Sequence, residues 1–371
     1  MPSMEYSSHA SLTLTTGYRI SRRSMLAGSA AALAAPLATV AATDLRRPAV
    51  RPALRLAAAQ TPATVSVSVQ NNTLSDTVYA FVTGQALENG NALMLLEADG
   101  QTPYYPSSPS ADGTPLAVDC AIPLNASGGA PVTITVPQLA GARLWFSIGT
   151  PLTFLLNPGP GLVEPSVSNP SDPNIGLPWD FCEFTDNSAQ LFANITFVDF
   201  VCIPVGLTLT DTAGNTQSVS GLAAGGLDTV CAGLAAQQAA DGNPWTDLIV
   251  TSGGQNLRAL SPQNGIVGNP AFLAGYYDDY VSQVWEKYRS ATLTIDTQAS
   301  YGTVTGQVSD GLLIFDGVGS FARPATADIV SCATGPFAAG GLSDEMLAIV
   351  QAGPVSSGSP EQLLVTVGPV H

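Results

Sequence analysis

From residue 64 onward, apolar and polar positions alternate over short runs that glycine, proline and asparagine interrupt. Residues 65–69 and 132–136 alternate with a period of two, which is typical of half-buried strands. Apolar runs at 144–148 and 152–156 flank a Gly-Thr-Pro turn, and Asn89-Gly90 is a hairpin signal. Many short strands separated in this way favour a β-sandwich or barrel.

Two segments instead repeat their apolar residues at helical spacing. The first begins near Leu227 and ends at Asp241-Gly242, and the second covers residues 277–288. Strands then resume at 291–295 and 311–315. The pattern predicts a mainly β protein, with a β-domain over 62–219 that is completed by 291–371 and a helix-containing mixed α/β insertion over 220–290. A cleft is expected where the two meet, because ligands often bind at such junctions.

The first 61 residues have a different composition. Arg22-Arg23, in the run Ser-Arg-Arg-Ser-Met-Leu, precedes an alanine-rich apolar run over 27–42 that is too short for a stable membrane span. This order predicts a twin-arginine signal peptide over 1–42, a flexible leader over 43–61 and a secreted protein. The alternative is a chance Arg-Arg pair in a disordered tail.

Charge narrows the choice of partner. The whole chain has a formal net charge of −16, and residues 1–61 carry seven of its twelve basic side chains but only two of its twenty-eight acidic ones, so the remainder is at −21. Such a surface repels nucleic acid and anionic lipid, and a neutral or cationic partner is expected. No later apolar stretch is long enough to span a bilayer, so no membrane association is expected.

Histidine and cysteine limit the possible chemistry. The only histidines are His9 and His371, so a Ser-His-Asp triad, a Cys-His pair and histidine-based zinc sites lack their central residue. In an enzyme, carboxylates would have to transfer the protons. The five cysteines, which show no CxxC spacing, allow up to two disulfides whose pairing stays open: Cys120, Cys182, Cys202, Cys231 and Cys332. Neither a metal nor an organic cofactor is expected.

Two carboxylates lie in unusual surroundings. Glu183 and Asp199 sit inside the aromatic and β-branched runs 181–185 and 197–201, where charged groups are rare unless they are paired or used. If both runs are strands and neighbours in one sheet, both carboxylates can point to the same side. Two acids that face one groove meet the requirement of glycoside hydrolysis for a proton donor and a second carboxylate.

A structural explanation of the same two residues is also open. Glu183 and Asp199 can be rim residues, or ion-pair partners of Arg143 and Arg289.

Several longer motifs carry a resemblance. The chain resembles glycoside hydrolase family 64, the thaumatin-like β-1,3-glucanases that release laminaripentaose, over most of residues 65–337. The similarity lies in LTFLLNPGPGLVEPS (152–166), FCEFT (181–185), LFANITFVDFV (191–201) and PVGLTL (204–209), and it extends through 226–231, 285–288 and 332–337.

The resemblance implies a thaumatin-like β-sandwich or barrel domain and a smaller mixed α/β domain that enclose a wide groove for a β-1,3-glucan. It also implies an inverting mechanism, with Glu183 as general acid and Asp199 as general base. By similarity, Thr185, Asn187 and Thr196 contact sugar hydroxyls, and the protein is expected to act as a monomer without a cofactor.

The sequence departs from the family pattern in two places. Phe192 stands where some members carry tryptophan, which weakens one platform on which a sugar ring could stack. After residue 337 the Asn-Arg-containing closing segment of the family is missing, and a last strand is expected over 363–367.

These observations predict a secreted endo-β-1,3-glucanase that cleaves a neutral glucan by single displacement. One alternative is the same fold acting on a different β-glucan. Another is a non-catalytic thaumatin-like protein that binds glucan or a cell wall. Because a binding module needs neither Glu183 nor Asp199, the presence of both favours catalysis.

Overall fold

The structure is a computed structural model that describes residues 63–188, 191–195, 197, 199–211, 216–296, 302–331 and 360–367. The predicted signal peptide and leader lie outside this part of the chain. The described residues form two compact units, of which the larger holds residues up to 274 together with 360–367, and the smaller begins at Gly275. The sequence placed divisions near residues 220 and 290, whereas the helical segment 226–268 belongs to the same unit as the large sheets.

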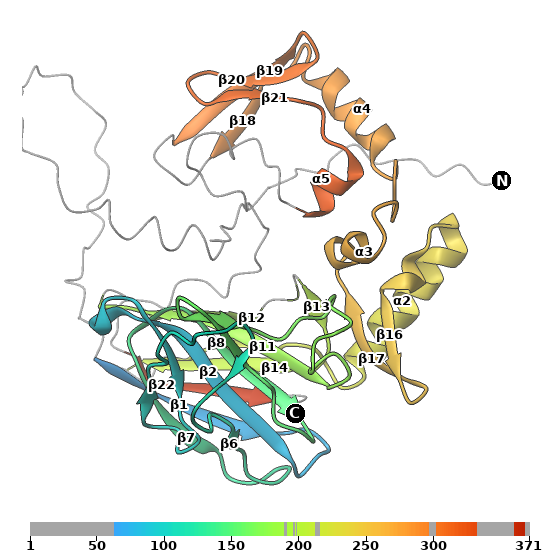
Figure 1. The fold of residues 1–371 in the computed structure, drawn as a ribbon. Helices are drawn as coiled ribbons and strands as arrows, with labels where there is room; N and C mark the ends of the chain where they lie inside the picture. Colours follow the sequence, from blue (N-terminus) through green and yellow to red (C-terminus); the bar gives the residue numbers. More distant parts are fainter. Residues whose placement is uncertain are drawn as a thin grey trace, which may run out of the picture. The chain divides into compact units, whose positions relative to one another are not determined.

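A seven-stranded sheet forms one layer of the larger unit (Figure 1). Its strands run in the order β12-β11-β8-β2-β3-β4, and β6 pairs with β2. The bounds are β2 Val78–Ala86, β3 Ala92–Leu96, β4 Pro103–Tyr104, β6 Ile122–Pro123, β8 Leu139–Ile148, β11 Trp179–Asp186 and β12 Leu191–Ile195. The predicted hairpin is confirmed, because β2 and β3 pair antiparallel across the short 3-10 helix η1 (Leu87–Asn89) and Gly90 has a φ of 63°.

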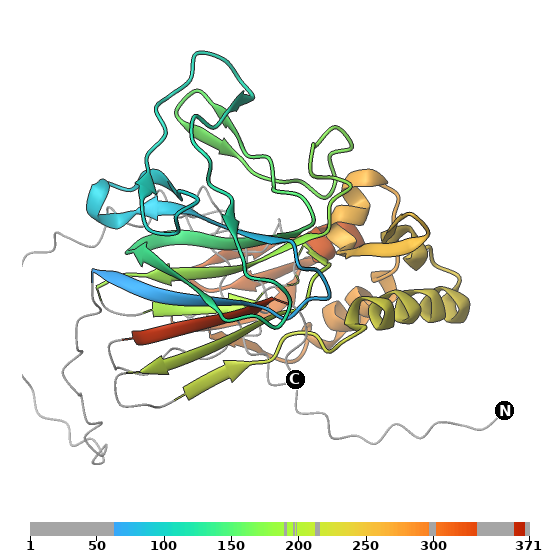
Figure 2. The same ribbon diagram turned by 90° about the horizontal axis from the view of Figure 1, so that it is seen from below.

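A five-stranded sheet forms the second layer, in the order β15-β14-β22-β1-β7 (Figure 2). Its strands are β1 Thr64–Asn71, β7 Val132–Pro137, β14 Val205–Asp211, β15 Thr216–Val219 and β22 Pro360–Val367. The predicted last strand is therefore confirmed, and it lies parallel to β1 and antiparallel to β14. Buried residues of both sheets belong to one hydrophobic cluster, so the layers form a sandwich.

Shorter elements complete the larger unit. Strands β5 (Thr114–Pro115), β9 (Leu155–Asn157) and β10 (Gly161–Val163) form one small sheet, and β13 (Phe200–Val201), β16 (Ile249–Ser252) and β17 (Gln255–Leu260) form another. The helices are α2 (Gly226–Asp241), the 3-10 helix η2 (Trp245–Leu248) and α3 (Pro262–Gly268). Helix α2 ends where the sequence predicted, because Gly242 adopts a left-handed conformation and donates its N–H to the Gln238 carbonyl.

The smaller unit is a mixed α/β structure. A four-stranded sheet consists of β18 (Leu293–Asp296), β19 (Thr303–Ser309), β20 (Leu312–Phe315) and β21 (Gly319–Phe321), and it is accompanied by α4 (Asp278–Lys287) and α5 (Thr326–Ser331). Its own core gathers around Phe315 and includes Trp285 of α4. The fold is thus mainly β with a smaller mixed α/β part, as the sequence predicted.

One predicted strand is shorter than expected. The run 152–156 was predicted to be a strand, but β9 starts only at Leu155. The Asn174 side chain accepts a hydrogen bond from the Thr153 N–H at 2.8 Å and donates one to the Thr153 carbonyl at 2.9 Å. A side-chain amide therefore takes the place of a neighbouring strand at this position.

Four of the five cysteines lie in the described part of the chain. Cys120, Cys182, Cys202 and Cys231 are free and buried, and burial raises the pKa of each thiol. Cys332 lies outside the described residues.

Among the described helices, none is long and apolar enough to cross a lipid bilayer.

Strand β11 alternates between two faces. Asp180, Cys182, Phe184 and Asp186 share one face and are all buried. Both carboxylate oxygens of Asp186 are buried without a hydrogen-bond partner in the described structure. Burial raises the pKa of Asp186 to about 7, so this carboxyl is neutral in the folded protein at acidic pH.

We expect Asp186 to make stability fall with rising pH. The unfolded chain releases this proton near pH 4 and the folded chain only near pH 7, so its stabilising contribution is complete below about pH 4 and lost between about pH 4 and 7, up to about 4 kcal/mol. Asp186→Asn should therefore become increasingly stable relative to wild type as pH rises. Urea unfolding from pH 4 to 8 measures this difference, and a difference that is constant with pH contradicts the assignment.

Candidate active site

A polar row crosses the seven-stranded sheet. Thr83 of β2 pairs in register with Arg143 of β8, which pairs with Glu183 of β11, which pairs with Asn194 of β12. Directly opposed residues of antiparallel strands project to the same face, so these four side chains lie side by side. The Asn194 side chain is 5% exposed, and its Oδ1 is buried without a hydrogen-bond partner in the described structure.

An aromatic row lies next to the polar one. Phe81, Trp145 and Phe181 are opposed in register on the same three strands, two positions away from Thr83, Arg143 and Glu183. Trp145 packs against Phe181 with ring centroids 4.9 Å apart, and its Nε1 donates to the Thr83 Oγ1 at 2.9 Å. These contacts give the polar row a rigid apolar base.

Arg143 is shared between two carboxylates. Its Nε donates to Oε1 of Glu183 at 3.0 Å and its Nη2 forms an ion pair with the same oxygen at 2.9 Å, while its Nη1 donates to Oε2 of Glu164 at 3.0 Å. The guanidinium carbon lies 4.3 Å from the Phe181 ring centroid and 5.2 Å from that of Trp145. Cation–π contact and two ion pairs therefore fix this side chain, which is only 15% exposed.

Glu164 lies on a loop after β10, and hydrogen bonds to buried polar side chains hold this loop in place. Asp172, which is 8% exposed, accepts hydrogen bonds from the Ser166 N–H at 2.9 Å and the Asn174 N–H at 2.7 Å. Asn174 in turn accepts a hydrogen bond from Trp179 Nε1 through its backbone carbonyl at 3.2 Å. These bonds anchor the loop that follows β10 to the strand that carries Glu183.

Asp199 lies outside the sheet that carries Glu183. The expected strand over 197–201 is reduced to β13, Phe200–Val201, which pairs with β17, and Asp199 occupies the bend before it. Its backbone carbonyl accepts hydrogen bonds from the Ser261 N–H at 2.9 Å and from Asn264 Nδ2 at 2.8 Å. The chain turns here because these donors at the start of α3 replace a strand partner.

A buried carboxylate connects Asp199 to β11. Asp180, which is 2% exposed, accepts hydrogen bonds from the N–H groups of Phe181 (2.9 Å), Cys202 (3.1 Å) and Ile203 (3.0 Å). Burial raises the pKa of Asp180 to about 7, although these N–H groups and Arg258 favour its charged form. Asp180 therefore fixes the segment after Asp199 to the strand of Glu183.

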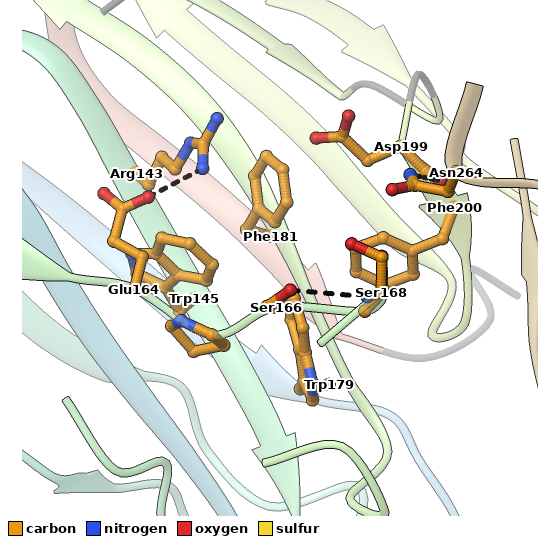
Figure 3. Close-up of a pocket in the computed structure, with 12 residues that line it drawn as sticks. Arg143, Trp145, Glu164, Ser166, Ser168, Trp179, Phe181, Asp199, Phe200 and Asn264 are labelled. Atoms are coloured by element: carbon orange, nitrogen blue, oxygen red, sulfur yellow. Dashed lines mark hydrogen bonds and ion pairs between the residues drawn. The ribbon is translucent and has the colours of Figure 1, made fainter. Parts of the chain in front are cut away.

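These elements enclose a cavity of about 260 Å³. Its lining includes Arg143, Glu164, Ser166, Phe181, Asp199 and Asn264. Figure 3 shows Arg143 and Glu164 on one side of Phe181 and Asp199 with Asn264 on the other. Glu183 does not itself line the cavity, but it is ion-paired to Arg143, which does, and its side chain is 27% exposed. The arrangement brings one carboxylate on a sheet and one on a bend to the same region.

The other predicted site residues are only partly described. Thr185 shares the face of Glu183, and its hydroxyl accepts a hydrogen bond from the Gly141 N–H at 3.4 Å. Asn187 is half-buried directly after β11. The backbone of Phe192 pairs with Thr185, but its side chain, like the whole of Thr196, lies outside the described structure.

The structural explanation of the carboxylates is confirmed for one pair. Arg143 does bind Glu183, whereas Arg289 binds Glu286 at 3.0 Å within the smaller unit. An ion pair with Arg143 is compatible with catalysis, because many active-site carboxylates are held by a neighbouring charge.

Sequence reasoning missed four residues of this site. Asp180 could have been found from period two, which places it on the opposite face of β11 from Glu183. Glu164 lies inside a motif that was recognised, but no local pattern joins it to Arg143. Asn194 and Asn264 carry no sequence signal, because only the strand register and the turn into α3 bring them here.

Asp199 at the cavity and Glu183, ion-paired to Arg143 of its lining, are two carboxylates from different elements of a β-sandwich, which suits the glycoside hydrolase class. The comparison with protein families agrees with this class. The family model described as beta-1,3-glucanase, glycoside hydrolase family 64, matches residues 63–365. The chain therefore belongs to glycoside hydrolase family 64.

Individual relatives extend the comparison. The chain is 28% identical over 240 residues to the glucan endo-1,3-beta-glucosidases of Cellulosimicrobium cellulans and Arthrobacter sp. (strain YCWD3), which covers 64% of this chain and 41% of each relative. The chain thus spans less than half the length of these curated relatives.

The fold of this chain is similar to that of solved β-1,3-glucanase structures. A laminaripentaose-producing beta-1,3-glucanase in complex with laminaritetraose is 27% identical with a TM-score of 0.67, over 83% of this chain and 99% of that one. A beta-1,3-glucanase domain from Clostridium beijerinckii has a TM-score of 0.58 at 18% identity, over 82% and 98% of the two chains, and supports the fold alone.

We expect Asp172→Ala to destabilise the larger unit. The substitution leaves the buried N–H of Asn174 and the N–H of Ser166 without their acceptor, which costs about 1–3 kcal/mol for each group that stays unsatisfied. Urea unfolding measures the loss. The matched control is Asp99→Ala, because Asp99 accepts two backbone N–H groups in a similar turn but is exposed. Equal effects of the two substitutions would contradict a role for burial.

Proposed function

We propose that this chain is an endo-acting β-1,3-glucanase. Membership of glycoside hydrolase family 64 supports this proposal, as does the similarity to a β-1,3-glucanase whose structure holds laminaritetraose. The observation that carries it is the pair of carboxylates, Asp199 at the cavity and Glu183 of β11, which is ion-paired to Arg143 of the cavity lining. The strongly acidic chain suits a neutral polysaccharide as its substrate.

Glu183 acts as the general acid and Asp199 as the general base of an inverting reaction. The acid protonates the glycosidic oxygen while the base takes a proton from the water that attacks the anomeric carbon. Inversion requires the carboxyl groups to lie about 6.5–9.5 Å apart, which leaves room for this water. Directly opposed residues of adjacent strands are closer, with Cβ atoms about 4.5–5.5 Å apart, so the placement of Asp199 outside the sheet of Glu183 supports a single displacement.

Thr185, Asn187, Phe192 and Thr196 would bind sugars around this centre. The cavity of about 260 Å³ is smaller than sites that enclose a whole small ligand, at about 300–1,000 Å³, so it would hold only part of a longer glucan. Laminaripentaose is the proposed product, by analogy with the similar glucanase. The reaction uses two carboxylates without a cofactor, and the enzyme is proposed to act as a monomer.

We expect Glu183→Gln and Asp199→Asn each to lower kcat on linear β-1,3-glucan by a factor of about 10²–10⁴, because each removes one proton-transfer group. Chromatography of the products measures the loss, and NMR of the first-formed anomer tests inversion. Glu286→Gln, which removes an exposed carboxylate of the smaller unit, is the control and should retain activity.

Two outcomes would contradict the proposal. Wild-type activity of Glu183→Gln would remove it as the acid. Tight glucan binding without product from any of these proteins would favour a non-catalytic glucan- or cell-wall-binding protein.

The proposed enzyme is exported by the twin-arginine pathway. Its support is the order of Arg22-Arg23 and the apolar run after them. Replacement of both arginines by lysine should retain the protein inside a bacterial host with this pathway, which immunoblots of cell and medium fractions measure. Undiminished secretion of the variant would contradict this route.

A further inference from the structure

The surroundings of Glu183 are unusual for a general acid. A general acid must hold a proton before it reacts, yet the neighbouring Arg143 donates a hydrogen bond to Oε1 through Nε and forms an ion pair with it through Nη2. A cation beside a carboxyl group ordinarily favours its ionised form. Something in the site must therefore allow the protonated form to persist next to an arginine.

The contacts of Arg143 define where the proton can reside. Nε donates to Oε1 of Glu183 and Nη2 lies 2.9 Å from the same oxygen, so Oε1 is the oxygen that accepts from Arg143. The hydrogen bond and the ion pair from Arg143 are both made to Oε1 and not to Oε2. The transferable proton therefore belongs on Oε2, in a carboxyl group whose orientation Arg143 fixes.

Glu164 supplies the missing charge. With Glu164 ionised, Arg143 and a protonated Glu183 form a cluster of zero net charge, whereas ionised Glu183 leaves the cluster with one uncompensated negative charge. Because the side chains of Arg143 and Glu164 are only 15% and 13% exposed, the neutral arrangement is favoured. Glu164 thus shares the charge of Arg143, so the guanidinium is not committed to Glu183 alone.

We propose that Arg143 and Glu164 form a positioning pair that orients the carboxyl group of Glu183 and sets the pH at which it loses its proton. The inference rests on the proposed function of Glu183 as the acid. During the reaction, the Oε2–H bond breaks and the proton forms an O–H bond on the leaving glycosidic oxygen as its bond to the anomeric carbon breaks. The new negative charge on Glu183 then lies against the guanidinium, which is already in place.

Other groups around Glu183 do not supply this charge balance. Asn194 opposite it on β12 is neutral, and Cys182, its neighbour on β11, projects to the opposite face with a thiol whose pKa burial raises. Asp199 reaches the cavity from the bend before β13, and its charge is common to all the variants below. Of the five basic residues after residue 61, Arg143 is the one that binds Glu183.

The test compares two substitutions with opposite expected signs. Glu164→Gln leaves Arg143 paired with Glu183 alone, so the alkaline limb of the kcat/KM profile should move about one pH unit lower. Arg143→Met leaves Glu164 and Glu183 as neighbouring carboxyls, so the alkaline limb should move higher while kcat falls about 10-fold or more. The profiles are measured on linear β-1,3-glucan, with Glu286→Gln as the control that breaks an exposed ion pair.

A second substrate separates positioning of the acid from general damage to the site. A 2,4-dinitrophenyl β-laminarioligosaccharide has a leaving group that needs no protonation, so Arg143→Met and Arg143→Lys should lose far less activity on it than on glucan. A purely structural role would lower both activities equally.

Each outcome decides the inference. Shifts in the same direction, or no shift in Glu164→Gln, would overturn it while an inactive Glu183→Gln leaves the proposed function intact. Full activity of Glu183→Gln would overturn the proposed function itself. Should Arg143→Met fail to fold, the shift of Glu164→Gln alone supports or refutes the positioning pair.

Discussion

The site depends on one buried carboxylate, that of Asp180. It joins the first residues of β11 to the N–H groups of Cys202 and Ile203, directly beyond β13, and Arg258 lies in the same buried region. A carboxylate at 2% exposure is costly unless such partners satisfy it, so removing it would leave several buried donors without an acceptor. Glu183 lies three residues from one end of this connection and Asp199 three residues from the other, so one contact governs their separation.

The two carboxylates are held by different physical means. Strand register fixes Glu183, because Arg143 and Asn194 are its directly opposed neighbours and the aromatic row beside them is fully packed. Hydrogen bonds from Ser261 and Asn264 to a backbone carbonyl fix Asp199, and its side chain projects from a bend. A sheet alone would place two carboxylates at the spacing of its strands, whereas a sheet and a bend allow a wider separation.

The alternation of apolar and polar residues with a period of two predicted part of the fold and the face of β11 that carries Glu183. It located β1 and β7, while apolar runs located β20 and the final strand, and glycine at position 242 located the end of α2. It failed where side chains substitute for strand partners, as Asn174 does before β9 and Asn264 does at Asp199. These contacts join residues more than twenty positions apart, so no local pattern carries them. The same limit hid the link between Glu164 and Arg143, whereas Asp180 and Asp186 followed from the alternation and were overlooked.

The contrast between Asp186 and Glu183 shows how neighbours determine the use of a carboxyl group on a single strand. Asp186 is buried on the core face, and within the described part of the chain its carboxylate oxygens have no partner, so burial alone raises its pKa and isolates it from a substrate. Glu183, three residues earlier on the opposite face, is 27% exposed beside an arginine whose charge a second glutamate balances. Burial can hold a proton in place but also isolates it from any reactant. The side chain of Glu183 can be reached from solvent, and this difference supports Glu183, and not Asp186, as the proposed acid on β11.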